Sequence, residues 1–274
     1  MNGGDLALVA GEGSLPLEIV RSLKKRGAEM PKVYLLGVNV EDYAAEGVSA
    51  QRVNNPMAVA LLLMKMRLQG VRRMMMAGTF PKRNIYAEEK MDSGAKNILS
   101  QVKDRNDHSL LAGVVSYLEK FGISVVSYED IIPDMFAWEG HIGGPAPTQE
   151  QLNDSEYGLA VLRKLLPLSF GQSIVVSNRA VVAVEAMEGT DQMIRRAASL
   201  SRRGILLKGM RADQDRRYDL PVVGAETLRS MSQSGLSGLF VQAGSVLLLD
   251  REKFLQEAEE LQISVTGVAP CQFL

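Results

Sequence analysis

The chain has 274 residues, of which 46% are hydrophobic and 23% are charged, and its formal net charge is -1 at pH 7. These values lie near globular averages, which argues against a disordered chain, a bundle of membrane helices and recruitment of nucleic acid by overall charge. The single cysteine, Cys271, cannot form a disulfide within the chain, and Met1–Gly13 lacks the pattern of a signal peptide. A cytoplasmic protein is therefore expected.

The first 131 residues alternate between predicted strands and helices. Asn55 and Pro56 are typical of a helix start and predict that the second helix begins directly after them. The alternation predicts a Rossmann-like N-terminal domain, residues 1–131, with helices on both faces of a parallel sheet. Strands are expected at 5–10, 32–37, 71–77 and 123–127, and helices at 17–26, 57–68, 95–101 and 109–121.

Two loops in this domain are candidates for ligand binding, because each follows a predicted strand. The first contains Gly11, Gly13 and Ser14, and the second contains Gly78 and Thr79. A strand, a glycine-rich turn and a helix together offer backbone amides and a positive helix end to an anion. A proline occupies the third glycine position, so the dinucleotide fingerprint is incomplete. Two interpretations of the first loop stay open: a loop that binds a phosphate or a uridine nucleotide, and a tight turn between strand and helix.

A stretch rich in glycine and proline, residues 132–155, predicts a linker. The residues after it, 156–274, predict a mixed α/β domain, because hairpin strands and helices both occur there. Asp154 and Ser155 are expected to cap its first helix, and Asn178-Arg179 is expected to form a tight hairpin turn. Helices are expected at 156–166, 192–201, 226–234 and 251–261, and strands at 172–177, 180–186, 204–208, 238–242 and 245–250.

The stretch Val181–Gly224 in this second domain gathers carboxylates and cations behind two apolar runs, VVAV and GILLK. Each run predicts a short buried strand with polar chemistry at its C-terminal end. Carboxylates hold hard divalent cations and guanidinium groups hold phosphoryl oxygens, so the composition fits a metal with phosphates. A salt-bridged surface is an equally open interpretation at this point.

Five runs along the chain carry a resemblance to a known family. They are LALVAGEGSLPLEIV, MMMAGTFPKRNIY, VVAVEAMEGTDQMIRRA, KGMRADQDRRYDLPVVGAETL and SGLSGLFVQAGSVLLLDRE. In this order they resemble the LpxI-type UDP-2,3-diacylglucosamine pyrophosphatases of lipid A biosynthesis, and the similarity covers nearly the whole chain.

The resemblance implies an activity, a cofactor and partners. The activity is Mg²⁺-dependent hydrolysis of the pyrophosphate of UDP-2,3-diacylglucosamine, which yields UMP and 2,3-diacylglucosamine 1-phosphate. It also implies two domains that close around a lipid-linked UDP-sugar, and a homodimer. Because the substrate carries two acyl chains, a cytoplasmic enzyme would touch the inner membrane surface peripherally.

Residue roles follow from this resemblance and from side-chain chemistry. Asp215 and Asp219 are the predicted catalytic carboxylates, one holding Mg²⁺ and the other orienting or deprotonating water, and their spacing in a loop lets them face one cavity. Glu185 and Asp191 would complete the metal shell. The alternative for Asp219 is an acceptor of loop amides ahead of Pro221.

The predicted substrate-binding residues fall into three groups. Long polar side chains are predicted to bind phosphate oxygens. Backbone amides at a helix start form a second predicted anion-binding site. Uridine or ribose contacts are assigned to the N-terminal loops. The phosphate-binding side chains are Lys208, Arg216 and Arg217, the backbone amides are those of Gly189 and Thr190, and the loop residues are Gly11, Gly13, Ser14, Gly78 and Thr79. Gln214 is a further predicted substrate-binding residue.

The sequence bears on two other function classes as well. A non-catalytic nucleotide- or lipid-binding protein of the same fold would not need the acidic set that this chain carries. A Rossmann oxidoreductase is disfavoured, because the second strand ends in Gly37-Val38-Asn39 and lacks the acidic ribose ligand.

Overall fold

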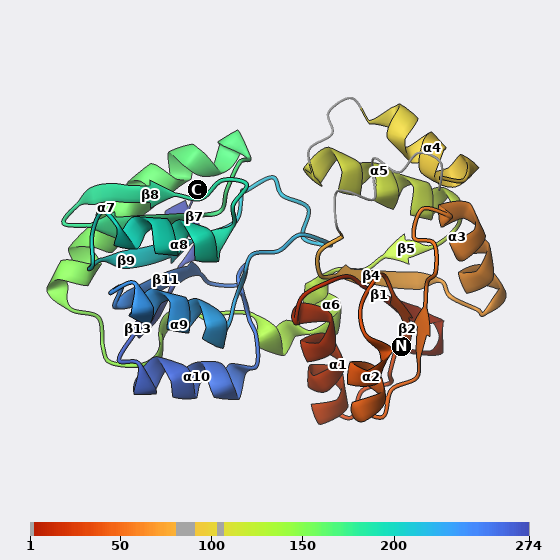
Figure 1. Ribbon diagram of the computed structural model, residues 1–274, viewed down its shortest axis with the longest axis horizontal. Helices are drawn as coiled ribbons and strands as arrows, with labels where there is room; N and C mark the ends of the chain where they lie inside the picture. Colours follow the sequence, from red (N-terminus) through yellow and green to blue (C-terminus); the bar gives the residue numbers. More distant parts are fainter. Residues whose placement is uncertain (1–2, 81–90, 103–106, 274) are drawn as a thin grey trace. The chain divides into compact units, whose positions relative to one another are not determined.

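The computed structural model describes residues 3–80, 91–102 and 107–273. The chain forms two compact units (Figure 1). Unit 1 comprises Met1–Pro133 and Arg216–Asp219, and unit 2 comprises Asp134–Asp215 and Leu220–Leu274. A short segment from the second half of the sequence therefore belongs to the N-terminal unit.

Unit 1 contains a five-stranded sheet in the order β3-β2-β1-β4-β5, and every neighbouring pair is parallel. This confirms the predicted Rossmann-like parallel sheet, although β3 was not foreseen. The order places β1 between β2 and β4, so the chain reverses direction across the sheet between β1 and β4. The strands are β1 Leu6–Ala10, β2 Lys32–Leu35, β3 Ala50–Arg52, β4 Arg73–Ala77 and β5 Ser124–Val125.

The helices of unit 1 connect these strands and cover the sheet (Figure 1). In sequence order they alternate with the strands largely as predicted. The helices are α1 Leu15–Lys25, α2 Val40–Ala45, α3 Val59–Leu68, α4 Ser93–Gln101, α5 Asp107–Lys120 and α6 Tyr128–Ile131, with a 3-10 turn at Gly3–Asp5.

The start of α3 corrects a sequence prediction. The helix begins at Val59 rather than directly after Asn55 and Pro56, and Asn55 accepts the amide of Met57 instead. The α3 amides of Ala60 and Leu61 donate to Asp92, whose other oxygen caps α4. A residue 32 positions away along the chain thus supplies the cap that local sequence was expected to supply.

Unit 2 contains a six-stranded sheet in the order β6-β13-β11-β9-β7-β8. Strands β13, β11 and β9 run parallel, whereas β6 and β7 pair antiparallel with their neighbours, so the sheet is mixed as predicted. The strands are β6 Gly140–Gly143, β7 Ser173–Ser177, β8 Ala180–Val184, β9 Ile205–Lys208, β11 Gly238–Gln242 and β13 Ser264–Val268; β10 Val222–Val223 and β12 Leu247–Leu248 form a separate parallel pair.

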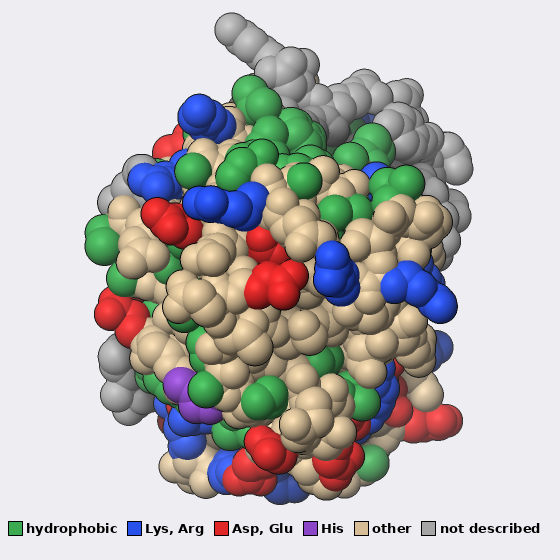
Figure 2. Space-filling model, turned by 90° about the vertical axis from the view of Figure 1, so that its left-hand side faces the viewer, with side chains coloured by type: hydrophobic (Ala, Val, Ile, Leu, Met, Phe, Trp, Pro, Cys, Tyr) green, Lys and Arg blue, Asp and Glu red, His purple; other side chains and the backbone are tan. Residues whose placement is uncertain are grey.

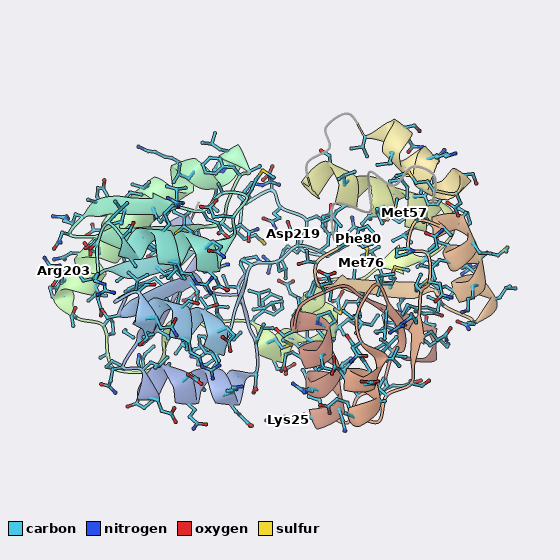
Figure 3. The ribbon with its side chains drawn as sticks, in the orientation of Figure 1. Lys25, Met57, Met76, Phe80, Arg203 and Asp219 are labelled. Atoms are coloured by element: carbon cyan, nitrogen blue, oxygen red, sulfur yellow. The ribbon has the colours of Figure 1, made fainter. Side chains whose placement is uncertain are left out.

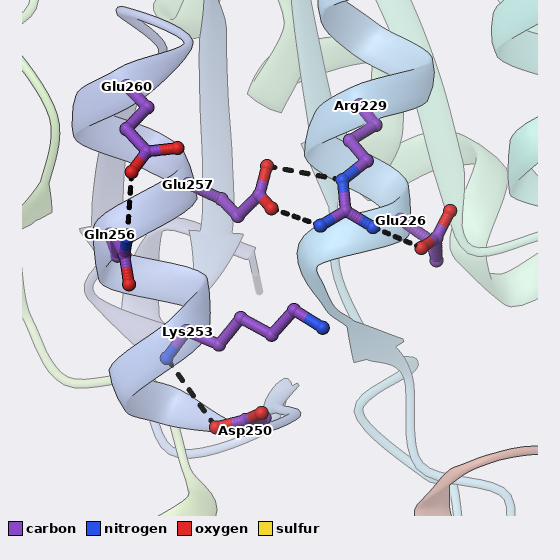
Figure 4. A network of polar contacts seen from close by, with 7 residues as sticks. All are labelled: Glu226, Arg229, Asp250, Lys253, Gln256, Glu257 and Glu260. Atoms are coloured by element: carbon purple, nitrogen blue, oxygen red, sulfur yellow. Dashed lines mark hydrogen bonds and ion pairs between the residues drawn. The ribbon is translucent and has the colours of Figure 1, made fainter.

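Helices cover both faces of this sheet. Along β7, Ile174 and Val176 pack with α7, while Val175 packs with the core under α8, α9 and α10, as the two-residue period of a strand requires. The helices are α7 Gln149–Leu165, α8 Thr190–Ala198, α9 Ala225–Gln233 and α10 Arg251–Glu260, with 3-10 turns at Pro133–Met135, Leu166–Leu168 and Pro270–Phe273. Figure 4 shows Arg229 of α9 joined to Glu257 of α10 and to Glu226.

The hairpin between β7 and β8 confirms the predicted turn at Asn178-Arg179, and both residues have positive φ, 52° and 56°. Its stabilisation was not predicted. Asp154 is buried in the middle of α7 and accepts the amides of Asn178 and Arg179 at 3.0 and 2.6 Å. It does not cap a helix, because α7 begins earlier, at a capping box formed by Thr148 and Gln151.

Candidate functional site

The two predicted N-terminal loops lie side by side at the carboxyl end of β1 and β4. Glu12 and Thr79 exchange two backbone hydrogen bonds of 2.8 Å, and Gly11 donates to Ala77. A Cβ on Gly11 would lie 2.6 Å from the Thr79 carbonyl oxygen, and a Cβ on Gly78 would lie 2.6 Å from that of Glu12. Glycine at both positions is therefore explained by the close approach of the loops.

These loops leave other predicted positions exposed at the sheet edge. Gly13 has φ 98° with open space around it, and Ser14 precedes α1 without a side-chain cap bond. Gly78 and Thr79 are exposed as well. The structure thus brings the predicted loop residues together at the crossover point between β1 and β4, where open α/β sheets bind ligands.

A cavity of about 410 Å³ adjoins these loops, and sequence reasoning had missed it. It lies within unit 1 between the sheet and helices α3, α4 and α5, and Asp219 is among its lining residues. Figure 3 labels Met57, Met76, Phe80 and Asp219, which come from separate stretches of unit 1 and lie around it. Its described lining residues are spread over seven stretches of sequence, so no local pattern could have indicated it.

Residues 216–219 are anchored on unit 1. Arg216 forms an ion pair with Glu129, and Arg217 forms one with Glu119 at 2.8 Å. Tyr218 is 3% exposed and belongs to the hydrophobic core of this unit. The two predicted phosphate ligands therefore have carboxylate partners here, which fix the segment that carries Asp219.

Asp219 itself is exposed and has φ 56°, a left-handed conformation that is uncommon outside glycine and asparagine. The negative charge of Asp219 acts on the hydroxyl of Tyr128, which donates a hydrogen bond to the Met76 carbonyl oxygen. Burial raises the pKa of Tyr128 well above its usual value, and the negative charge of Asp219 raises it further. The segment holds a carboxylate in a strained backbone position beside the cavity, as is common at functional sites.

Unit 2 gathers a second group of predicted residues, the Glu185 cluster, which consists of Gln172, Glu185, Thr190 and Lys208. The Thr190 hydroxyl donates to Glu185 Oε1 at 2.8 Å and accepts from Lys208 Nζ at 2.7 Å. The Gln172 amide donates to the other Glu185 oxygen. Glu185 is 9% exposed and Lys208 is 6% exposed, so this is a buried pair of opposite charges bridged by a hydroxyl.

The strand ends explain this cluster. Lys208 ends β9 and Glu185 follows β8, and both strands run antiparallel to β7, so their carboxyl ends share one edge. Gly189, with φ 82°, is the residue that precedes α8, and Thr190 is the first residue of the helix. Its hydroxyl is consequently directed to Glu185 and Lys208.

The remaining predicted residues of unit 2 differ in burial. Gln214 is 9% exposed and accepts from Gln172, whereas Asp191 is exposed and Asp215 is half-buried. In the part of the chain that the structure describes, no three His, Cys, Asp or Glu side chains are grouped to hold a metal ion. The metal roles of Glu185, Asp191, Asp215 and Asp219 stay predictions.

The fold and these features define a class: a two-unit α/β protein with a Rossmann-like unit, an apolar cavity and polar clusters at the carboxyl ends of its sheets. Residues 5–135 match the LpxI N-terminal domain, and residues 138–266 match the LpxI C-terminal domain. The chain belongs to the LpxI family, as its resemblance had indicated.

One relative matches along the full length. A Caulobacter vibrioides protein named UDP-2,3-diacylglucosamine pyrophosphatase LpxI is 29% identical over 279 residues, which cover 97% of this chain and 98% of that protein. The match therefore includes both units and the segment that connects them.

Proposed function

We infer that the chain is a UDP-2,3-diacylglucosamine pyrophosphatase of lipid A biosynthesis. The observation that carries this inference is the match to both LpxI domains in order, together with the relative of that name along 97% of the chain. Family membership favours the enzyme over the non-catalytic binding protein. The reaction adds water across the pyrophosphate and yields UMP and 2,3-diacylglucosamine 1-phosphate.

We assign three tasks to the residues of this chain. Lys208 places a buried positive charge at the sheet edge, and its Thr190 partner holds the ammonium in position for a phosphate oxygen. Asp219 orients and deprotonates the attacking water, since it is an exposed carboxylate beside the unit 1 loops. Asp215 contributes the second carboxylate of the same loop.

Mg²⁺ is the cofactor that we propose. Mg²⁺ keeps several waters and uses one or two carboxylates plus substrate phosphates, so Asp215 and Asp219 fit it without a preformed protein cage. Bound there, the ion would neutralise phosphoryl charge. Among the described residues the four predicted carboxylates do not form one group. The proposed metal-binding roles of Glu185 and Asp191 are therefore supported only by the chemistry of their carboxylates.

Peripheral contact with the inner membrane surface, by a cytoplasmic homodimer, completes the proposal. Among the described residues no helix is long and apolar enough to cross a bilayer. Helix α3, which lines the cavity on one side, exposes Leu61, Met64 and Leu68 on the other, with Lys65 beside them. An apolar stripe with a cation suits an anionic lipid surface. Cosedimentation with anionic vesicles should fall when Leu68 is changed to Ser.

The function is tested by UMP release from UDP-2,3-diacylglucosamine. Asp219→Asn keeps the left-handed backbone accessible, because asparagine tolerates it, and should lower kcat by about 10²- to 10⁴-fold. Asp213→Asn is the control, since Asp213 is 82% exposed in the same loop and pairs with Arg211. Chelation should abolish UMP release and Mg²⁺ should restore it. Wild-type activity in Asp219→Asn would refute the assigned role, and absence of UMP from the wild type would refute the function.

A further inference from the structure

The cavity of unit 1 is too large to be a packing defect. Protein interiors are packed as densely as organic crystals, whereas this space measures about 410 Å³. That volume lies in the range of small-molecule sites. Its walls are formed by β1, β4 and helices α3, α4 and α5, so regular elements maintain it.

The lining identifies the chemistry of the occupant. Among the described residues that line the cavity, Thr79 and Asp219 alone have polar side chains. The rest are apolar, and methionines such as Met57, Met74 and Met76 adapt to flexible hydrocarbon. A uracil or ribose needs several hydrogen-bond partners, and the Glu12 and Thr79 amides already donate to each other's carbonyl oxygens. The site therefore favours a hydrocarbon chain.

The two polar residues determine the orientation of a molecule bound in the cavity. Thr79 follows the carboxyl end of β4 and Asp219 is exposed, so the polar part of the lining faces the sheet edge. A volume of about 410 Å³ is enough to accommodate a long acyl chain. An amphiphile would place its head at the edge and one tail among the methionines.

We propose that this cavity of unit 1 binds one acyl chain of UDP-2,3-diacylglucosamine and sets the acyl-length preference of the enzyme. The proposal rests on the proposed function for the identity of the substrate. Its tail lies against α3, α4 and α5, while Asp219 stands at the end where the tail joins the sugar.

The proposal is tested by introducing a large side chain on α5 that fills the cavity. Val114 lines it, whereas Ala112 on the same helix is exposed, so Val114→Trp blocks the space and Ala112→Trp is the matched control. The substrates are UDP-2,3-diacylglucosamines whose acyl chains differ in steps of two methylenes. For the wild type and the control, each step of shortening should lower kcat/KM by roughly 15-fold, since each buried methylene contributes similarly.

Val114→Trp should act on long chains alone. The variant should lower kcat/KM at least tenfold for the longest substrate and leave the shortest unchanged, so that the length dependence disappears. A folded Val114→Trp protein with wild-type length dependence, or with an equal loss at every length, would overturn the proposal. Leu111→Phe, a smaller change at another lining position, gives the same comparison if Val114→Trp does not fold.

A binding measurement separates this proposal from the function. Tetradecanoate should raise the Tm of the wild type and of Ala112→Trp, but not that of Val114→Trp. If the wild type releases no UMP, the proposed function fails while the fatty-acid measurement still decides whether the cavity takes an alkyl chain. An equal Tm shift in all three proteins would show that the fatty acid binds elsewhere and would overturn the assignment.

Discussion

At the scale of single residues, the hydroxyl of Thr190 bridges the charged groups of Glu185 and Lys208, which are both buried and costly to bury alone. It donates to Glu185 and accepts from Lys208, so one side chain contributes a hydrogen bond to each of the two buried groups. The sequence predicted polar chemistry at the strand ends, but it assigned a role only to the backbone amide of Thr190, at a helix start. Only the strand geometry reveals that its side chain bridges a carboxylate and an ammonium.

Replacing Thr190 tests this bridge. Thr190→Val should lower the free energy of unfolding by about 1–3 kcal/mol, because Glu185 and Lys208, both buried, each lose a hydrogen bond. It should also raise KM for the substrate, since Lys208 is no longer oriented. Thr190→Ser keeps the hydroxyl and should restore both values. Urea unfolding and initial rates measure the two effects, and wild-type behaviour of the valine variant would contradict the role.

A surface ion pair at the start of β1 makes stability depend on pH. Arg73 donates to Asp5 at 2.8 Å, and this hydrogen bond holds the pKa of Asp5 below its usual value. A carboxyl whose pKa is lower in the folded state stabilises the fold above its unfolded value of about 3.9, and the contribution is lost as the pH falls through the lowered pKa.

Asp5→Asn should therefore be less stable than the wild type near neutral pH, by a small margin because the pair is partly exposed. The difference should shrink as the pH falls below about 3.9. Unfolding curves in urea at several pH values measure it. A difference that grows in acid would have the wrong sign for this pair.

At the scale of elements, Asp92 shows how a helix start can depend on a distant residue. Its Oδ2 accepts from Ala60 of α3 at 2.8 Å, and its Oδ1 accepts from Ala95 of α4 at 2.9 Å. Both helices line the cavity, so one carboxylate fixes two of its walls. The local signal at Asn55 and Pro56 was misleading because the cap comes from another part of the chain.

Graded substitution of Asp92 separates the two caps. Asp92→Ala removes both and should cost about 2 kcal/mol of unfolding free energy, since each cap contributes about 1. Asp92→Asn retains one carbonyl oxygen and should lose about half of that amount. Chemical denaturation gives both values. Equal losses in the two variants would mean that the oxygen retained by asparagine supports neither helix start, and would contradict this division.

At the scale of the whole molecule, residues 216–219 belong to unit 1 although the sequence around them builds unit 2. Tyr218 enters the core of unit 1, and two ion pairs hold the arginines before it. Along the sequence, Arg216 and Arg217 lie in the acidic and basic stretch of the predicted second domain. The structure instead gives the carboxylate of Asp219 to the unit that holds the cavity.

Removing the Tyr218 ring tests this anchoring. Tyr218→Ala should destabilise unit 1 by about 3 kcal/mol, the lower end for loss of a buried aromatic side chain. Amide hydrogen exchange should quicken in residues 1–133 and stay unchanged in the sheet of unit 2. Tyr157→Ala is the control, because Tyr157 is 37% exposed on α7. Faster exchange confined to unit 2 would contradict the assignment.

The sequence by itself determined the strand and helix alternation, the tight hairpin at Asn178-Arg179, the mixed second sheet and the family. These features depend on residues that are close together along the chain: hydrophobic periodicity sets the elements, turn residues set the hairpin, and short sequence motifs indicate the family. The tertiary structure decided the cap at Asp92, the Thr190 bridge, the unit to which Asp219 belongs and the apolar cavity. Each of these joins side chains far apart along the chain, so packing and not local pattern brings them together.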